Sequence, residues 1–242
     1  MRKLPRAIVA LILKWEAKFY ITLNKPSIVA IAGITGKNAL KRMIAQELSD
    51  HDIGVRAHPR GYNTDIGLPL AILFIEPESF TAFNWLKTIT KGFFKCLRKD
   101  REKTCLVVEL GVSQAGDMKT LLDIITPEML LILDIIEHPQ SRVSAAVLLE
   151  EVKLAISRLS ADGALIVNID SSYLADIRQK FPLLDIVTYG FSDRADYKLA
   201  SFDENNIGVS FLLDGQMVKL AQHGKNYALF YAAARAVRAR LK

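Results

Sequence analysis

Several residue types that mark common protein classes are scarce in this sequence of 242 residues. Its two cysteines, Cys96 and Cys105, are too few for a disulfide framework and lack the spacing of a zinc site. The 13 glycines and 8 prolines form no low-complexity tract or repeat. The apolar run Ala7–Leu13 covers only seven residues, too few to cross a bilayer, and no signal-peptide cleavage site follows it. These absences argue against a disulfide-rich secreted domain, a solenoid or a disordered chain, and they favour a globular domain in a reducing compartment.

The net charge of the chain limits which kinds of partner it can have. It carries 32 Lys and Arg against 26 Asp and Glu, a formal net charge of +6. This surplus suits an anionic ligand or a membrane surface. It is spread along the chain, however, and no motif of interleaved basic and aromatic residues accompanies it. We therefore expect no nucleic-acid partner.

The first 24 residues are predicted to form a basic amphipathic helix. Two faces of the helical wheel differ in character, with Leu4, Ile8, Leu11, Trp15 and Phe19 on one and Lys3, Arg6, Lys14 and Lys18 on the other. Two interpretations remain open: a helix that packs on its own domain, and an interfacial helix on a membrane. No linker interrupts residues 25–242, so we expect a single domain preceded by this helix.

After Pro26, strand-like and helix-like segments alternate. We expect strands over Ile28–Ala32, Ile53–Ala57, Cys105–Leu110, Met129–Ile135, Ala164–Ile169 and Leu184–Thr188. Helices are expected over Lys37–Ser49, Ser79–Arg98, Asp117–Ile125, Ser144–Ser160, Ser171–Lys180 and Asn226–Leu241. Short alternating strands over Tyr197–Phe202, Ile207–Leu213 and Gln216–Ala221 add a small antiparallel region near the C-terminus. The pattern predicts an α/β fold of three layers, a P-loop-like parallel sheet flanked by helices.

The segment Gly33–Lys37 lies between a predicted strand and a predicted helix. Backbone N–H groups, a helix N-terminus and the Lys37 charge can together cradle a phosphate. The spacing is shorter than that of the usual phosphate loop, because Ile31 stands where its first glycine would be. Asn38 and Ala39 occupy the positions where a hydroxyl residue would hold Mg²⁺. The segment predicts a phosphate-binding site in which the usual Mg²⁺ ligand is replaced.

Three further residues carry weaker signals. Glu109 closes one predicted buried strand and His138 follows another, so both fall at the sheet edge where parallel sheets bind ligands. Glu109 could hold Mg²⁺ beside a nucleotide, and His138 could serve a metal or a phosphate. Taken alone, an acid at a strand end and a loop histidine are more often merely solvated. Lys153, on a predicted helix with acidic neighbours, is by itself a solvated lysine.

The order of these motifs resembles the Mur ligase family, the ATP-dependent amide-bond ligases that extend the peptide of the peptidoglycan precursor. The likeness runs from about Pro26 to the end of the chain. Its segments are Gly33–Lys37, Tyr62–Leu70, Glu109–Met118, the neighbourhood of His138, Lys153, Ala161–Asn168, Tyr189–Asp196 and Gly224–Phe230.

The resemblance implies a set of roles. The cofactors would be ATP and Mg²⁺, and the substrates a UDP-MurNAc-peptide carboxylate and an amine. Nucleotide contacts would come from Gly33, Thr35, Gly36, Lys37, Asn38 and Asn226. Glu109 and His138 would hold Mg²⁺, Lys37 would act on the phosphates, and a carbamylated Lys153 would serve a second Mg²⁺. Asn63 and Thr64 would contact the substrate.

Departures from the family pattern affect the same site. Asn38 and Ala39 replace hydroxyl residues, Gln140 replaces a glutamate, and Asn226 and Phe230 replace a histidine and an asparagine near the base. The family's N-terminal domain, which grips UDP, and its C-terminal domain are also expected to be missing. Two hypotheses follow. The first is a cytoplasmic Mur-type domain, either a fragment or a subunit completed by partner chains, that still binds ATP and Mg²⁺; the second is a degenerate binding or scaffold protein. A second basic amphipathic segment, Ser79–Lys99, would give either one a peripheral membrane contact.

Overall fold

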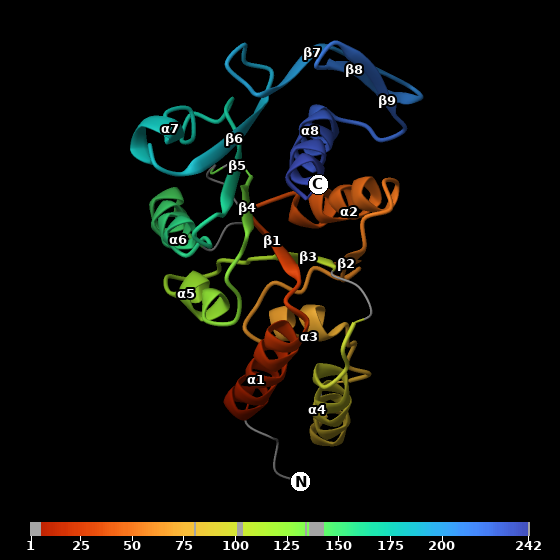
Figure 1. Ribbon diagram of the computed structural model, residues 1–242, viewed down its shortest axis with the longest axis vertical. Coiled ribbons are helices and arrows are strands. Elements are labelled where there is room, and N and C mark those ends of the chain that lie inside the picture. Colours follow the sequence, from red (N-terminus) through yellow and green to blue (C-terminus); the bar gives the residue numbers. More distant parts are fainter. Residues whose placement is uncertain (1–5, 80, 101–103, 134, 136–142, 242) are drawn as a thin grey trace.

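The computed structural model describes residues 6–79, 81–100, 104–133, 135 and 143–241. Its centre is a nine-stranded sheet in the order β2-β3-β1-β4-β5-β6-β7-β8-β9 (Figure 1). The strands are β1 (Ser27–Ala32), β2 (Val55–Ala57), β3 (Cys105–Glu109), β4 (Met129–Ile132), β5 (Ala164–Asn168), β6 (Asp185–Gly190), β7 (Tyr197–Asn205), β8 (Gly208–Leu213) and β9 (Gln216–Leu220). Neighbouring strands from β2 to β7 pair in parallel, whereas β8 and β9 extend the sheet antiparallel.

Helices cover both faces of the parallel part of the sheet. They are α1 (Arg6–Asn24), α2 (Lys37–Ser49), α3 (Gly67–Leu73), α4 (Ala82–Cys96), α5 (Asp117–Leu122), α6 (Ala145–Ser157), α7 (Ile177–Lys180) and α8 (Lys225–Arg240). Side chains of α1, α3, α5 and α6 share one buried cluster, and those of α2 and α8 share the other. The predicted three-layer α/β fold with its C-terminal antiparallel strands is confirmed.

Strand β1 shows why the sheet lies in the middle. All six of its residues are buried, and its alternating side chains enter the two clusters, Ile28 and Ala30 on one side and Val29 and Ile31 on the other. A strand buried on both faces needs an unbroken apolar run, which is the pattern that the sequence carries.

Two local expectations differ from the structure. The helix expected over Ser171–Lys180 is reduced to α7, because Ser171 and Leu174 accept turn hydrogen bonds ahead of it instead of starting a helix. Helix α1 packs through Val9, Leu13, Ala17 and Tyr20, not through the face with the larger apolar side chains that includes Trp15. The small Ala17 side chain allows close approach to the neighbouring elements.

The order of the strands fixes where a site can form. β1 lies between β3 and β4, with Ile31 in register with Glu109 and Ala32 in register with Ile132. The carboxyl ends of these three strands therefore meet at one edge, at the point where the order of connections reverses. In open parallel sheets, ligands bind at such a point.

Candidate functional site

The loop between β1 and α2 depends on two glycines. Gly33 has φ +134° and Gly36 has φ +84°, values that residues with a side chain rarely adopt. A Cβ at Gly33 would lie 2.7 Å from Leu133 Cβ, and one at Gly36 would lie 2.6 Å from Phe230 Cζ. Gly36 is also the N-cap of α2 and offers no side-chain cap, so the first N–H groups of this helix remain available to an anion.

Lys37 begins α2, and its side chain folds back over the loop. Its Nζ donates to the carbonyl oxygens of Gly33 (2.6 Å) and Ile34 (3.0 Å), and the residue is nine-tenths buried. Burial lowers the pKa of the Lys37 ammonium from its ordinary value, and the nearby Glu109 carboxylate opposes this effect. The loop therefore holds a cation at the end of β1, bound to carbonyl oxygens that a phosphate can replace.

Glu109, the last residue of β3, lies beside this loop but is not a free ligand. Its Oε1 is 2.7 Å from Lys41 Nζ, and both side chains are only 3% exposed. Lys41 Nζ also donates to the carbonyl oxygen of Arg60 at 2.7 Å. Sequence analysis missed Lys41, although its position one helical turn after Lys37 puts both ammonium groups on one side of α2. Lys41 thus neutralises the Glu109 carboxylate, and a Mg²⁺ ion would need the negative charge of that carboxylate.

The other residues on the metal side of the loop are neutral. Asn38 Oδ1 is buried and has no hydrogen-bond partner among the described residues, so it could accept from a ligand. Ala39 packs with the apolar side chains between α2 and α8 and can ligate nothing. Within the described residues, no group of three or more His, Cys, Asp and Glu side chains is placed to hold a metal ion. The residues present fit a phosphate group well and a divalent cation poorly.

The polar loop before α3 reaches the same edge of the sheet. The Asn63 carbonyl oxygen accepts from Gly111 N–H (3.0 Å), and Thr64 Oγ1 accepts from Gly67 N–H (3.1 Å) at the start of α3. A Cβ added to Gly61 would lie 3.6 Å from Glu109 Oε2, so this loop passes directly over the glutamate. The structure thus brings Asn63 and Thr64 close to the end of β3.

Three predicted site residues stand apart from this cluster. Lys153 lies on the exposed side of α6, where its Nζ is 2.7 Å from Glu150 Oε1, and it makes no contact with Lys37 or Glu109 among the described residues. Asn226 is exposed in the first turn of α8. His138, like Gln140, lies outside the described residues.

Thr35 and Phe230 complete the surroundings of the loop. Thr35 is exposed in the loop itself, while Phe230 is 7% exposed and places its ring against Gly36. The ring also meets Tyr227 edge to face at 5.9 Å between centroids. An aromatic side chain thus covers one flank of the phosphate cradle, a contact between distant segments that no sequence spacing reveals.

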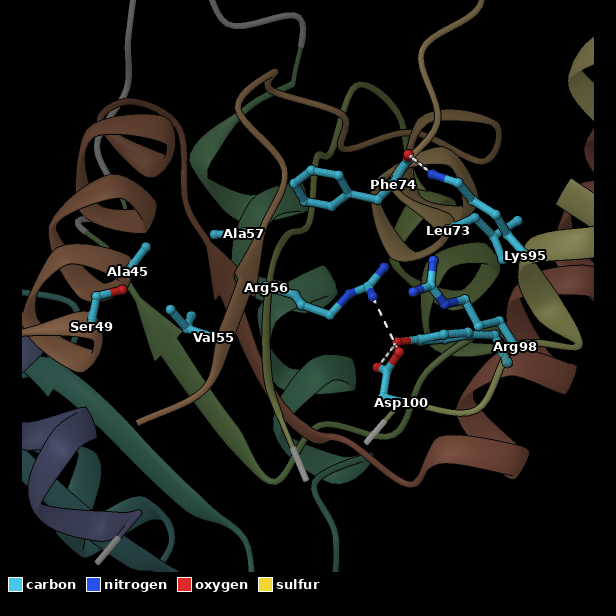
Figure 2. Close-up of a pocket in the computed structure, with 11 residues that line it drawn as sticks. Ala45, Ser49, Val55, Arg56, Ala57, Leu73, Phe74, Lys95, Arg98 and Asp100 are labelled. Carbon is cyan, nitrogen blue, oxygen red and sulfur yellow. Dashed lines mark hydrogen bonds and ion pairs between the residues drawn. The ribbon is translucent and has the colours of Figure 1, made fainter. Parts of the chain in front are cut away.

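A cavity of about 530 Å³ opens beside the edge strand β2 (Figure 2). Arg56 lies there between the rings of Tyr20 and Phe74, at 5.1 and 5.6 Å from their centroids, and pairs with Asp100 at 3.4 Å. Lys95 and Arg98 add two further cations. None of the site residues expected from the sequence lines this cavity, so it is separate from the cluster at Lys37.

Comparison with known proteins adds sequence evidence. No protein-family model matches the chain. The curated UDP-N-acetylmuramoyl-tripeptide–D-alanyl-D-alanine ligase of Bacillus subtilis (strain 168) is 26% identical over 204 residues, which are 82% of this chain and 37% of that protein. The chain therefore spans well under half the length of this relative.

Solved structures show the same fold. MurF from Acinetobacter baumannii superposes with a TM-score of 0.75 at 19% identity, over 96% of this chain and 47% of that one. MurF ligase from Thermotoga maritima, in complex with ADP, gives a TM-score of 0.72 at 19% identity, over 98% and 50%. A mutant of L. casei FPGS gives 0.62 at 13% identity, over 99% and 63%. The chain is thus similar in sequence to one Mur ligase and shares its fold with solved structures of others.

Proposed function

We propose that the loop Gly33–Lys37 binds the phosphates of an adenine nucleotide, and that the chain is the nucleotide-binding part of an ATP-dependent amide-bond ligation system. One observation carries this proposal: a glycine loop, a helix N-terminus and a buried lysine converge at the carboxyl end of β1, beside Glu109. The relative from Bacillus subtilis is named as a UDP-N-acetylmuramoyl-tripeptide–D-alanyl-D-alanine ligase, and one structural neighbour holds ADP.

Each part of the cradle has a defined task. Lys37 exchanges its two carbonyl partners for phosphate oxygens and offsets their charge. The N-terminus of α2 adds N–H donors along the same direction. Bound ATP supplies the phosphoryl group that activates a carboxylate, and the residues of this chain hold and neutralise it. Asn63 and Thr64, at the end of β3, are placed to meet the acceptor, which by relationship is a UDP-MurNAc-peptide.

The residues that would contact Mg²⁺ favour a reduced role for this ion. Asn38 offers a neutral oxygen, Ala39 offers none, and Lys41 already neutralises Glu109. A nucleotide would therefore be held mainly by Lys37 and the loop, with little dependence on Mg²⁺. This weak donor set, together with the Phe230 ring over Gly36, supports a second candidate: a binding or scaffold protein of the cytoplasm that keeps a nucleotide without transferring its phosphate.

Calorimetric titration with ATP and ADP, with and without Mg²⁺, tests the proposal. We expect micromolar affinity, about −8 kcal/mol, that changes by less than roughly threefold when Mg²⁺ is added. Lys37→Met should weaken binding at least tenfold, about 1.4 kcal/mol. Lys219→Met, which removes an exposed lysine from β9, is the matched control. No binding at millimolar nucleotide would refute the nucleotide function.

A second pair of substitutions separates the two candidates. Asn38→Thr with Ala39→Ser restores hydroxyl groups beside the loop, so Mg²⁺ should then raise nucleotide affinity if the cradle is otherwise intact. An unchanged affinity would show that the metal ligand is not what limits the site. Amide formation from a UDP-MurNAc-peptide, assayed with candidate partner chains, would favour the ligase over the scaffold.

A further inference from the structure

Exposed apolar side chains concentrate at one end of the molecule. Helices α1 and α4 lie side by side there, far from β7–β9 (Figure 1). Of the fourteen large apolar side chains that are exposed in the described part of the chain, nine lie on these helices or directly after α4: Ile8, Leu11, Trp15, Phe19, Phe83, Leu86, Phe93, Phe94 and Leu97. We call these nine residues the α1–α4 apolar face. Soluble domains rarely gather so many large apolar groups without a partner for them.

Packing within the domain does not account for this face on α1. The helix is anchored by Val9, Leu13, Ala17 and Tyr20, all at most 2% exposed. Its other apolar stripe stays in solvent, and Trp15 is 63% exposed. A helix needs only one apolar stripe to dock on its own domain, so the second stripe is free for another surface.

Helix α4 is organised in three stripes. Thr88, Gly92 and Cys96 face inward at a spacing of four residues. The exposed apolar residues lie on the opposite side, and Phe83 and Phe94 are each 68% exposed. A stripe of lysines runs between these two. Because the inward stripe holds the helix in place, its apolar side is presented outward.

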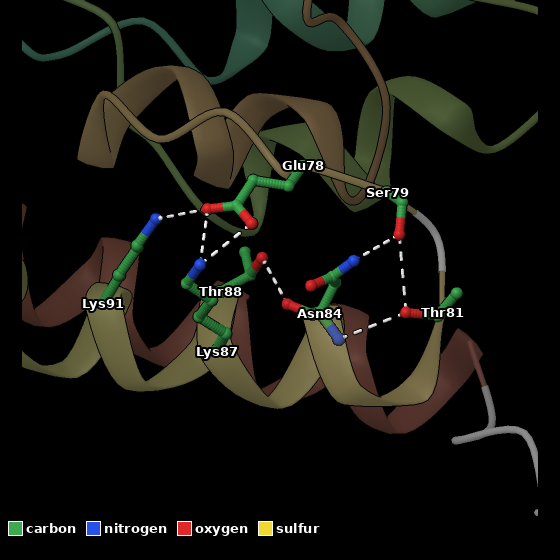
Figure 3. Close-up of polar contacts among 7 residues, drawn as sticks. All are labelled: Glu78, Ser79, Thr81, Asn84, Lys87, Thr88 and Lys91. Carbon is green, nitrogen blue, oxygen red and sulfur yellow. Dashed lines mark hydrogen bonds and ion pairs between the residues drawn. The ribbon is translucent and has the colours of Figure 1, made fainter.

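The start of α4 is fixed by polar contacts (Figure 3). Thr81 Oγ1 accepts from Asn84 N–H as the N-cap of the helix. Glu78 pairs with Lys87 (2.6 Å) and Lys91 (3.3 Å), and these cations hold the pKa of its carboxyl below the ordinary value. These contacts orient the lysine stripe beside the apolar residues, and one carboxylate offsets only part of its charge.

The charges on the two helices are predominantly positive. They carry six cations, Arg6, Lys14, Lys18, Lys87, Lys91 and Lys95, and Arg98 and Lys99 follow α4. Their single carboxylate, Glu16, is buried at the contact with Gly92, where burial raises its pKa to about 7. Lys18, Arg98 and Lys99 form no ion pair with a carboxylate of the described residues. Arg6 pairs with Asp65 and Lys14 with Asp123, so the charge that a second copy would repel is that of the remaining cations.

We propose that the α1–α4 apolar face docks on the surface of an anionic lipid bilayer. Aromatic and aliphatic side chains would enter the boundary between headgroups and acyl chains, while the flanking lysines contact acidic headgroups. Among the described helices, none has the length and apolarity of a transmembrane span, so the two helices lie on the membrane without crossing it. This attachment does not depend on nucleotide binding.

Co-sedimentation with vesicles tests the proposal, using phosphatidylcholine with and without phosphatidylglycerol. We expect binding to the anionic vesicles, weakened by salt, and a blue shift of Trp15 fluorescence in a Trp85→Phe background. Replacing Phe83, Phe93 and Phe94 by Gln should weaken vesicle binding roughly tenfold or more. These side chains are exposed, so the substitutions should leave the circular dichroism spectrum unchanged.

A matched control removes as many exposed apolar groups elsewhere. It replaces Leu183, Ile207 and Met217 by Gln. Equal loss of vesicle binding in both triple variants, or no binding by the wild type, would overturn the proposal. A concentration-dependent dimer that only the α4 variant abolishes, seen by sedimentation velocity, would also overturn it by assigning the face to a second copy. Should the α4 variant misfold, Trp15→Gln provides the same comparison at a single exposed position.

Discussion

Removing Lys41 should destabilise the fold more than its place on a surface helix suggests. Its ammonium lies 2.7 Å from the Glu109 carboxylate, and both side chains are 3% exposed. Lys41→Met keeps most of the side-chain volume but leaves the buried Glu109 carboxylate without its counter-charge. Breaking a buried pair from one side costs about 3–5 kcal/mol. For a chain of 242 residues, that loss lowers the melting temperature by roughly 10 °C.

A double-mutant cycle isolates the charge effect. Glu109→Gln alone and combined with Lys41→Met would be compared by urea unfolding at neutral pH. The double variant should be more stable than Lys41→Met alone, because it no longer buries an unpaired charge. Millimolar Mg²⁺ should stabilise Lys41→Met and leave the wild type unchanged, since only the variant has a free carboxylate beside the loop.

The reasoning fails if Lys41→Met costs less than about 1 kcal/mol, or if the losses of the two single variants simply add. Lys119→Met is the control: the Lys119 side chain is 63% exposed and pairs with Asp123, the C-cap of α5. Such an exposed pair contributes at most about 0.5 kcal/mol.

Three further predictions concern single positions. Burial raises the pKa of Glu16 from 4.5 to about 7, so wild-type stability should fall as pH rises from about 4.5 to about 7, by at most about 3 kcal/mol. Glu16→Gln should flatten this part of the pH profile, and an unchanged slope would refute the assignment. Glu151→Ala should cost about 2–3 kcal/mol in urea unfolding, because the buried Met118 N–H and the Gly116 N–H, at the start of α5, each lose a carboxylate oxygen at 2.7 Å. Glu150→Ala, its exposed neighbour, should change stability by less than about 0.5 kcal/mol. Gly36→Ala should cost about 3 kcal/mol, since it combines backbone strain with a clash against the aromatic ring on the loop. Gly116→Ala has a similar φ but open space around it, so thermal unfolding should show a loss of only about 1 kcal/mol.

Regular features of the fold were predictable from the sequence because they depend on neighbouring residues. The bounds of α2 are those expected, Lys37–Ser49, since an apolar stripe follows a glycine turn. The proximity of Lys37 and Glu109 was also predictable, because the carboxyl ends of parallel strands lie at the same edge of a sheet. The roles expected for Lys153, Asn226 and His138 stay predictions.

Contacts between distant segments were not predictable. Spacing places Lys41 one turn after Lys37 on α2, but nothing local shows that it contacts Glu109 at the end of β3. The choice of packing face on α1 depends on how closely Ala17 can approach other elements, which is a property of their shapes. Phe230 covers Gly36 only because α8 returns beside α2.

The two glycines of the phosphate loop have a consequence for reading such motifs in other sequences. Leu133 and the Phe230 ring fill the space where their side chains would stand, and both glycines have positive φ. Selection for folding alone would then retain Gly33 and Gly36, even in a descendant that had ceased to bind any phosphate. In this chain the two glycines therefore report how the turn packs, and they carry no information about turnover. Lys37, whose ammonium donates to carbonyl oxygens of its own loop, is the position whose variation would reveal whether the ancestral chemistry is still under selection.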